Sequence, residues 1–364
     1  MNTPQHAPKR ALFVTTTETP YGAEQSLRTL LEAAPLGWSC SLLACSQKVA
    51  DLCGPFAEET RLIGAHSGKL STLAAFGREI IKLRRDYDVI VLFSLKLLPI
   101  TLTARARGRA ARIVADIHDA PVGMDRRLSR FFLRFADGTI AISQFVVEHL
   151  GIHAAVIVPR PIADNADGTS LICTETPQTV TLGLIGRLDP EKRIEVAIDA
   201  MRLLPPRFVL RIYGDPCVYA GQEYAQALKS RAAYSGLIDF CGYAPADQIY
   251  DEVDGVIVCN EREPSGRTVG EAMLRSKVVF APDSGGALEY FDDSVSGFRY
   301  RARDPDSLAS VIDTAYQHGR DLTHLRNSAR EKIIEERSPR IVAEQYFGSL
   351  ERIAEGSQAT GATT

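Results

Sequence analysis

The stretch NEREPSGRTVGE, residues 260–271, joins a predicted strand to a predicted helix. The apolar run DGVIVC (254–259) before it is typical of a buried strand, and TVGEAMLRS (268–276) has a helical pattern that begins near Gly266. In a parallel α/β sheet such a loop lies at the carboxyl end of its strand, where ligands bind, and the helix start offers N–H groups to an anion. Two carboxylates, Glu263 and Glu271, flank this turn. The stretch therefore predicts a ligand with hydroxyl and phosphate groups, such as a sugar nucleotide.

Strands and helices alternate on both sides of this stretch. Seven strand patterns, from ALFVTTT (11–17) to AAVIVP (154–159), precede a segment with turn residues and little periodicity, and six more follow, from TVTLGLIG (179–186) to GFRY (297–300). Alternation of this kind predicts parallel, doubly wound sheets, and two series in tandem predict two Rossmann-like domains. The predicted parts are an N-terminal domain, a linker, a C-terminal domain, a final helix and a disordered tail, at residues 1–165, 166–178, 179–338, 339–355 and 356–364.

The motif EPSGRTVGE (263–271) resembles the E-P-F-G-x-x-x-x-E signature of the retaining glycosyltransferases of family 4. The resemblance implies the GT-B fold, two facing Rossmann-like domains with a C-terminal helix that crosses back to the first. It implies an enzyme that moves a sugar from a nucleoside-diphosphate-sugar donor to an acceptor hydroxyl. The acceptor class, whether a sugar, a lipid-linked molecule or a small molecule, stays open.

The segment GLIGRLDPEKR (183–193) is similar to the family's G-R-L-x-x-x-K segment, which makes Arg187 and Lys192 the implied diphosphate ligands. Charge-assisted hydrogen bonds to phosphate are each worth roughly 1.5–3 kcal/mol. No Asp-x-Asp lies at a strand end to hold a divalent ion, so we expect no metal and no cofactor. Arg187, Lys192 and helix dipoles are then expected to stabilise the leaving diphosphate.

The resemblance also assigns residues to the donor. Glu271 would bind the ribose hydroxyls and Glu263 those of the transferred sugar, while Gly266 and Arg267 would offer main-chain amides near that sugar or the phosphates. Further on, DSGGALEYF (283–291) resembles the family's G-G-x-x-E, in which glycines let backbone approach the ligand.

Four further positions follow from the same resemblance. Gly214 in RIYGD and Gly242 in DFCGY end strands that would hold the nucleotide base. In the first half, Gly22 lies in YGAE, which is similar to a G-G-x-E turn placed against the diphosphate, and His118 follows the strand ARIVAD near the expected donor sugar. The predicted catalytic residues are Glu263 and His118.

Ser265 and Tyr21 depart from the family pattern, which has Phe and Gly at these positions. These departures leave open a second function, a non-catalytic partner subunit that binds a nucleotide sugar without turnover. Glycoside hydrolysis by Glu263 and Glu271 fits less well, because a hydrolase has no use for Arg187 and Lys192. A dinucleotide oxidoreductase is disfavoured, because no G-x-G-x-x-G follows the first strand.

Composition and charge set wider bounds. The chain has 364 residues, 45% hydrophobic and 24% charged, which suits two globular domains. Residues 1–165 contain 20 Lys+Arg against 15 Asp+Glu, and the remainder contains 22 against 30, so a basic half precedes an acidic one. A basic half allows contact with a membrane surface, and we expect no nucleic-acid partner. Seven scattered cysteines, no CxxC and no signal-peptide pattern predict a reduced, cytoplasmic protein.

The segment GMDRRLSRFFLRFAD (123–137) predicts an amphipathic helix with an apolar and a basic face. Leu128, Phe131, Phe132 and Phe135 share the apolar face, and the arginines lie toward the other: Arg126, Arg127, Arg130 and Arg134. Because the helix leads into a buried strand, we expect its apolar face to pack on the sheet. The alternative is a helix that lies on a membrane surface.

Overall fold

The computed structural model describes residues 7–64, 68–104, 111–152, 155–163, 178–217, 221–317 and 321–356. The chain forms two compact units. Unit 1 comprises Met1–Pro161 and Arg337–Thr364, and unit 2 comprises Ile162–Glu336. The predicted linker, apart from Gln178, and the predicted tail beyond residue 356 lie outside the described residues.

Unit 1 contains a seven-stranded parallel sheet in the order β3-β2-β1-β4-β5-β6-β7. Its strands are β1 (Lys9–Thr15), β2 (Trp38–Ala44), β3 (Glu59–Leu62), β4 (Val89–Leu92), β5 (Arg112–Ile117), β6 (Gly138–Ala141) and β7 (Ala155–Ile157). Its helices are α1 (Gly22–Glu32), α2 (Gln47–Cys53), η1 (Gly54–Phe56), α3 (Lys69–Leu83), η2 (Leu95–Ile100), α4 (Thr101–Ala104), α5 (Gly123–Leu133), α6 (Gln144–Leu150) and α13 (Pro339–Ala354).

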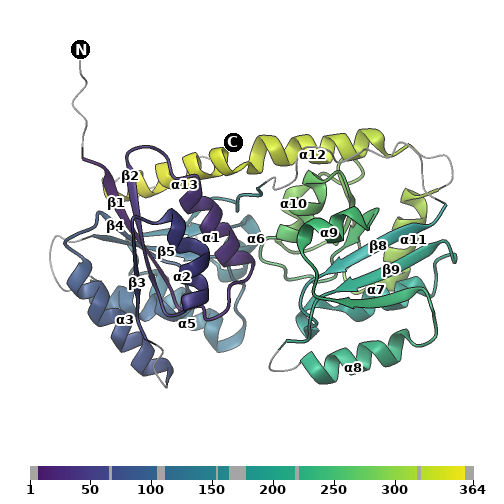
Figure 1. The fold of residues 1–364 in the computed structure, drawn as a ribbon, viewed down its shortest axis with the longest axis horizontal. Coiled ribbons are helices and arrows are strands. Elements are labelled where there is room, and N and C mark those ends of the chain that lie inside the picture. The colour runs from purple at the N-terminus through teal and green to yellow at the C-terminus, as the bar shows by residue number, and fades with distance from the viewer. Residues whose placement is uncertain are drawn as a thin grey trace, which may run out of the picture. The chain divides into compact units, whose positions relative to one another are not determined.

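The central strands of unit 1, β1, β4 and β5, are buried on both faces, as their continuous apolar runs predict, whereas the edge strands β3 and β7 are largely exposed or half-buried. In β1, Ala11 and Phe13 pack into the core that contains α1 and α13, while Leu12 and Val14 pack into the core that contains α3. The last helix, α13, drawn in yellow in Figure 1, thus supplies part of the core of unit 1. This confirms the prediction that the C-terminal helix returns to the first domain.

Unit 2 contains a six-stranded parallel sheet in the order β10-β9-β8-β11-β12-β13. Its strands are β8 (Val180–Ile185), β9 (Phe208–Tyr213), β10 (Ile238–Gly242), β11 (Gly255–Ile257), β12 (Val278–Pro282) and β13 (Phe298–Tyr300). Its helices are η3 (Pro190–Lys192), α7 (Ile194–Met201), α8 (Gly221–Ala232), α9 (Ala246–Asp251), α10 (Arg267–Leu274), η4 (Gly286–Tyr290), α11 (Pro305–Ala315) and α12 (Thr323–Arg337). The chain reverses its strand order between β8 and β11, which makes their carboxyl ends the topological switch point.

The predicted packing of the helix at residues 123–137 on the sheet is correct for Phe132 and wrong for Leu128 and Phe131. In α5 the buried side chains are Ser129 and Leu133, with Phe132 half-buried, whereas Leu128 and Phe131 are exposed. Ser129 and Leu133, four positions apart, face the core of unit 1, and Phe132 packs beside them, so Leu128 and Phe131 of the predicted apolar face are left in solvent. Within the described residues, no helix is long and apolar enough to cross a membrane.

Candidate sugar-nucleotide site

Three neighbouring strands of unit 2 end in glycines with positive φ. Gly186, Gly214 and Gly242 follow or end β8, β9 and β10, with φ of 150°, 139° and 69°. The Gly214 N–H donates to the Gly242 carbonyl at 2.8 Å, and a Cβ on Gly214 would stand 2.0 Å from the Gly186 carbonyl oxygen. Only glycine fits so close a backbone contact. These strand ends form a closely packed backbone edge beside the switch point, where Gly214 and Gly242 were predicted to hold a base.

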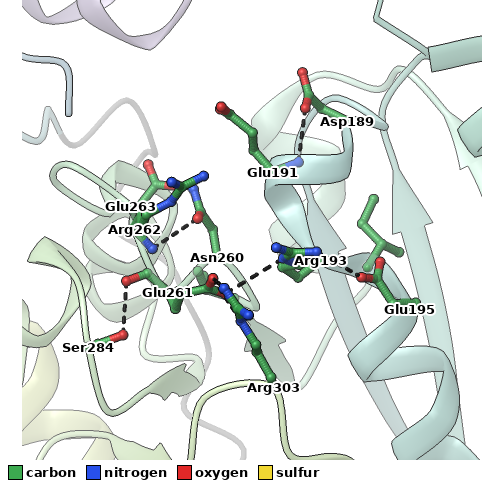
Figure 2. A network of polar contacts seen from close by, with 12 residues as sticks. Asp189, Glu191, Arg193, Glu195, Asn260, Glu261, Arg262, Glu263, Ser284 and Arg303 are labelled. Carbon is green, nitrogen blue, oxygen red and sulfur yellow. Dashed lines mark hydrogen bonds and ion pairs between the residues drawn. The ribbon is translucent and has the colours of Figure 1, made fainter. Parts of the chain in front are cut away.

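The loops after β8 and β11 bring a cation and a carboxylate together. The Lys192 ammonium donates to Glu263 Oε2 at 2.8 Å, and the Asn260 amide donates to the same oxygen at 3.1 Å. Figure 2 shows Asn260 and Glu263 on one side and the turn with Asp189 and Glu191 on the other. The predicted phosphate ligand Lys192 and the predicted sugar ligand Glu263 are therefore direct neighbours, 71 positions apart in sequence.

Glu263 is held in its ionised form. Burial would raise the pKa of this carboxyl, but the charge and hydrogen bond of Lys192, the hydrogen bond of Asn260 and the charge of Arg187 outweigh burial and lower the pKa. Arg187, which directly follows Gly186, has an exposed side chain. The site thus combines an acceptor oxygen pair with two cations, a set that suits hydroxyl and phosphate groups on one ligand.

The loop that carries Glu263 is fixed by the loop after β12. The Gly286 N–H donates to the Glu263 carbonyl at 2.7 Å, and the Ser284 hydroxyl donates to the Glu261 carbonyl at 2.9 Å. Gly285 has a φ of 92°, and a Cβ there would lie 3.2 Å from both the Glu261 carbonyl oxygen and the Glu263 nitrogen. The Gly285-Gly286 pair therefore allows close approach of one loop to another, and so positions Glu263.

Gly266 and Arg267 begin α10, as the sequence predicts. Gly266 has a φ of 94°, and a Cβ there would lie 2.7 Å from Ala287 Cα, so a larger residue would separate the two loops. Ser265, where the family pattern has Phe, is buried, and its hydroxyl lies 2.9 Å from the Tyr290 hydroxyl. At this departure from the family pattern, the interior of unit 2 thus contains a hydrogen bond between two hydroxyl groups.

Glu271 is held in place by two side chains. Arg267 Nε donates to Oε1 at 2.6 Å, and the Tyr250 hydroxyl donates to Oε2 at 3.0 Å. Burial, and after it the charge of Glu271, raises the pKa of Tyr250 well above its usual value, so this hydroxyl stays a donor. Glu271 is therefore orientated by Tyr250, a role that nothing in the spacing of the motif indicated.

A second carboxylate in the same loop, Glu261, was not predicted. Arg303 Nε donates to Glu261 Oε1 at 2.9 Å, and Arg193 Nε lies 3.8 Å from Oε2 (Figure 2). Burial would raise the pKa of Glu261, but the Arg303 hydrogen bond and both arginine charges lower it. Arg193 and Arg303 have left-handed backbones, with φ of 52° and 61°. This network joins three loops, and no local sequence signal links its members.

The remaining predicted residues, His118 and Gly22, belong to unit 1. His118 Nδ1 lies 3.5 Å from Asp116 Oδ1, and its ring centroid lies 4.6 Å from that of Phe93. Asp116 is buried, forms an ion pair with Arg160 and accepts a hydrogen bond from the Tyr346 hydroxyl at 2.7 Å. Burial would raise the pKa of Asp116, but the charge of Arg160, with contributions from His118, lowers it to about 2.

Gly22 is the first residue of α1, where the Glu24 carboxylate accepts from the Tyr21 N–H at 3.0 Å. This contact fixes the start of the helix, with Tyr21 in the position of the family's first glycine. In the part of the chain that the structure describes, no group of three His, Cys, Asp or Glu side chains could hold a metal ion.

Solved structures share this architecture. A crystal structure of Anabaena Alr3699/HepE in complex with UDP and glucose has a TM-score of 0.79 at 22% identity and covers 94% of this chain and 99% of that one. Sucrose-phosphate synthase from Thermosynechococcus elongatus has a TM-score of 0.77 at 17% identity and covers 94% of this chain and 98% of that one. The fold of this protein is that of the GT-B glycosyltransferases, as predicted.

Sequence comparisons indicate the same class of protein. Residues 175–332 match the family model of glycosyl transferases group 1. An uncharacterised glycosyltransferase of Methanocaldococcus jannaschii, MJ1607, is 27% identical over 161 residues, which are 42% of this chain and 40% of that protein. The match thus spans less than half of that relative's length. Fold and family match together support a glycosyltransferase.

Proposed function

We propose that this protein is a retaining, metal-independent glycosyltransferase that moves a sugar from a nucleoside-diphosphate donor to an acceptor hydroxyl. The observation that carries the proposal is the Lys192–Glu263 pair at the switch point of unit 2. A phosphate-binding cation beside a carboxylate that accepts from hydroxyls matches the two ends of a sugar diphosphate. The solved relative HepE, whose structures contain UDP and UDP-glucose, supports a donor of this class.

The proposed roles follow the contacts. An ammonium has three donors, so Lys192 can hold Glu263 and a phosphate oxygen together, with Arg187 as the second phosphate ligand. Both hydrogen bonds to the Glu263 carboxylate from described residues reach Oε2, which leaves Oε1 to accept from sugar hydroxyls. Glu271, orientated by Tyr250, would accept from the ribose. The backbone at Gly214 and Gly242 would contact the base. The main-chain amide of Gly266 would lie near the transferred sugar or the phosphates.

In the proposed reaction, the bond from the anomeric carbon to the diphosphate oxygen breaks, and its electron pair stays on that oxygen. The acceptor oxygen bonds to the anomeric carbon on the same face and passes its proton to the leaving phosphate. Arg187 and Lys192 would stabilise the charge that develops there. We assign no protein nucleophile.

A donor panel tests this function. Thermal unfolding should be measured with UDP-, GDP-, ADP- and TDP-sugars, because a ligand at 100 times its dissociation constant adds about 2.7 kcal/mol of stability. We expect one base to be preferred, and the stabilising donor to be consumed when acceptors are added. Failure of every donor to stabilise the protein would contradict the proposal.

The second candidate is a non-catalytic subunit that binds a nucleotide sugar. It is favoured by Tyr21, which stands in the position of the family's first glycine and is 49% exposed at the start of α1. Such a protein would be stabilised by donor but would neither transfer nor hydrolyse it. Slow hydrolysis of the stabilising donor without acceptor, lost in Glu263→Gln, would therefore distinguish the enzyme from the subunit.

A further inference from the structure

Helix α5 carries large apolar side chains in solvent. Met124 is 65% exposed, Phe131 48% and Leu128 47%, and Val122, directly before the helix, is 48% exposed. Phe131 is supported by edge contacts to Phe132 and Phe135, with ring centroids 5.3 Å apart in each pair. Single exposed apolar residues are ordinary, but a contiguous group on one helix marks an interaction surface.

The helix has three distinct faces. The positions of Ser129 and Leu133 turn toward the core of unit 1, and the stripe of Met124, Leu128 and Phe131 lies to one side of them. The third face carries four exposed arginines: Arg126, Arg127, Arg130 and Arg134. We call the exposed apolar stripe together with these arginines the α5 face.

The arginines of the α5 face are available to a partner. None of the ion pairs or side-chain hydrogen bonds among the described residues involves them, and Asp125 is the one acidic residue between Val122 and Arg134. Arg130 lies over the end of α6, where its guanidinium would stand 3.4 Å from a Cβ on Gly151. The surface therefore has a net positive charge beside an apolar stripe.

We infer that the α5 face binds the surface of an anionic lipid bilayer. An amphipathic helix with aromatic and aliphatic residues on one face and arginines on another lies in the plane of the interface, with the apolar stripe among the acyl chains and the arginines at the phosphates. A second copy of this chain fits less well, because a two-fold axis would bring the same basic surface to both sides of the interface. The inference does not depend on the proposed transfer reaction.

Vesicle sedimentation of the full chain tests the inference. We expect binding to vesicles of phosphatidylcholine with phosphatidylglycerol, weak binding to phosphatidylcholine alone, and loss of binding as salt screens the arginines. The double variant Leu128→Glu with Phe131→Glu should bind anionic vesicles only as weakly as the wild-type protein binds vesicles of phosphatidylcholine alone. Leu203→Glu, a change at a 53% exposed site in unit 2, is the matched control.

Variants of the arginines separate the contribution of charge to lipid binding from that of the apolar side chains. Arg126→Gln with Arg127→Gln should weaken binding about 25-fold, since one basic residue near an anionic surface contributes about 1 kcal/mol, or about fivefold. Arg85→Gln, at another exposed arginine of unit 1, should leave binding unchanged. All of these sites are exposed, so the variants should fold, which circular dichroism checks.

Three results would overturn the inference. One is that the wild-type protein binds neither kind of vesicle, and another is that the Leu128/Phe131 variant still binds. The third is concentration-dependent dimerisation in equilibrium sedimentation that this variant abolishes, without lipid binding, which would assign the α5 face to a second copy.

Discussion

Lys192 stands between a buried carboxylate and the proposed diphosphate, so its removal should have two effects. Lys192→Ala should weaken binding of the nucleoside diphosphate and barely change that of the nucleoside. It should also raise the pKa of Glu263, because burial then acts with less opposition, and move the acid limb of the kcat/KM profile to higher pH. Arg187→Ala should also weaken binding of the nucleoside diphosphate, and it should raise the pKa of Glu263 by less than Lys192→Ala does. Calorimetry and pH profiles measure both, and equal losses for nucleoside and diphosphate would count against these roles.

The two glutamates should separate by function. Glu271→Gln should weaken nucleotide and donor binding together, because both ligands carry the ribose and because the amide offers one acceptor oxygen where the carboxylate offers two, to Tyr250 and Arg267. Glu263→Gln should leave nucleotide binding nearly intact. Its turnover should fall, because the transition state loses about 2–4 kcal/mol of stabilisation. The affinity for the nucleoside diphosphate and the rate of sugar transfer, measured for both variants, test these two roles. Full activity in Glu263→Gln would favour the non-catalytic subunit.

Asp116 should make unit 1 sensitive to acid. Its pKa is about 2 in the folded protein and about 3.9 in the unfolded chain, so ionised Asp116 stabilises the fold fully above about pH 4 and less as the pH falls toward 2. The difference is worth about 2–3 kcal/mol. Asp116→Asn should remove this dependence and, by leaving Arg160 buried without its counter-ion, cost about 3–5 kcal/mol near neutral pH.

Urea unfolding over this pH range checks the Asp116 prediction. Asp119→Asn is the matched control, because the Asp119 carboxylate is 60% exposed. An Asp116→Asn variant as stable as the wild type near neutral pH would show that the buried pair with Arg160 contributes little.

At the scale of single elements, the end of β9 admits only glycine. Gly214→Ala places a Cβ 2.0 Å from the Gly186 carbonyl oxygen at a φ of 139°, so the strand ends must separate. We expect a loss of about 1–3 kcal/mol in stability and weaker nucleotide binding. Gly236→Ala is the control, since a Cβ there meets nothing within 4 Å. Chemical denaturation and calorimetry of both variants test this, and unchanged nucleotide binding in Gly214→Ala would remove the glycine edge from the site.

The strands could be predicted from the sequence because most of them are short apolar runs, and the central ones are buried on both faces. All thirteen predicted strands are present, and the start of α10 lies where Gly266 indicated. The seating of α5 could not be predicted, because amphipathicity does not tell which strip of a helix meets the core. In the site, motif spacing indicated Lys192 and Glu263, but their contact depends on the order of β8 and β11 in the sheet. Tyr250 comes from α9 and Arg303 from the segment after β13, so no sequence signal near the motif indicates either residue.

For the whole molecule, unit 1 depends on the last helix of the chain. Phe347 is fully buried, and its ring centroid lies 5.4 Å from that of Trp38 and 6.3 Å from that of Phe13. Phe347→Ala should therefore cost unit 1 about 3–5 kcal/mol. Leu36→Ala, at a fully exposed site of the same unit, should cost close to nothing. Scanning calorimetry should show a transition that moves to lower temperature in Phe347→Ala alone, and identical melting of the two variants would mean that α13 is dispensable for the stability of unit 1.

The place of α13 in the chain also sets an order of events during synthesis. The strands β1 to β7 leave the ribosome first, the whole of unit 2 follows, and α13 emerges after it. Domains generally complete their folding in the order in which they are made. In this chain we expect unit 2 to complete its folding before unit 1. All of unit 2 is synthesised before α13, the helix whose Phe347 packs against Phe13 and Trp38. The nascent chain thus presents an apolar face of unit 1 to chaperones for as long as the ribosome takes to translate unit 2.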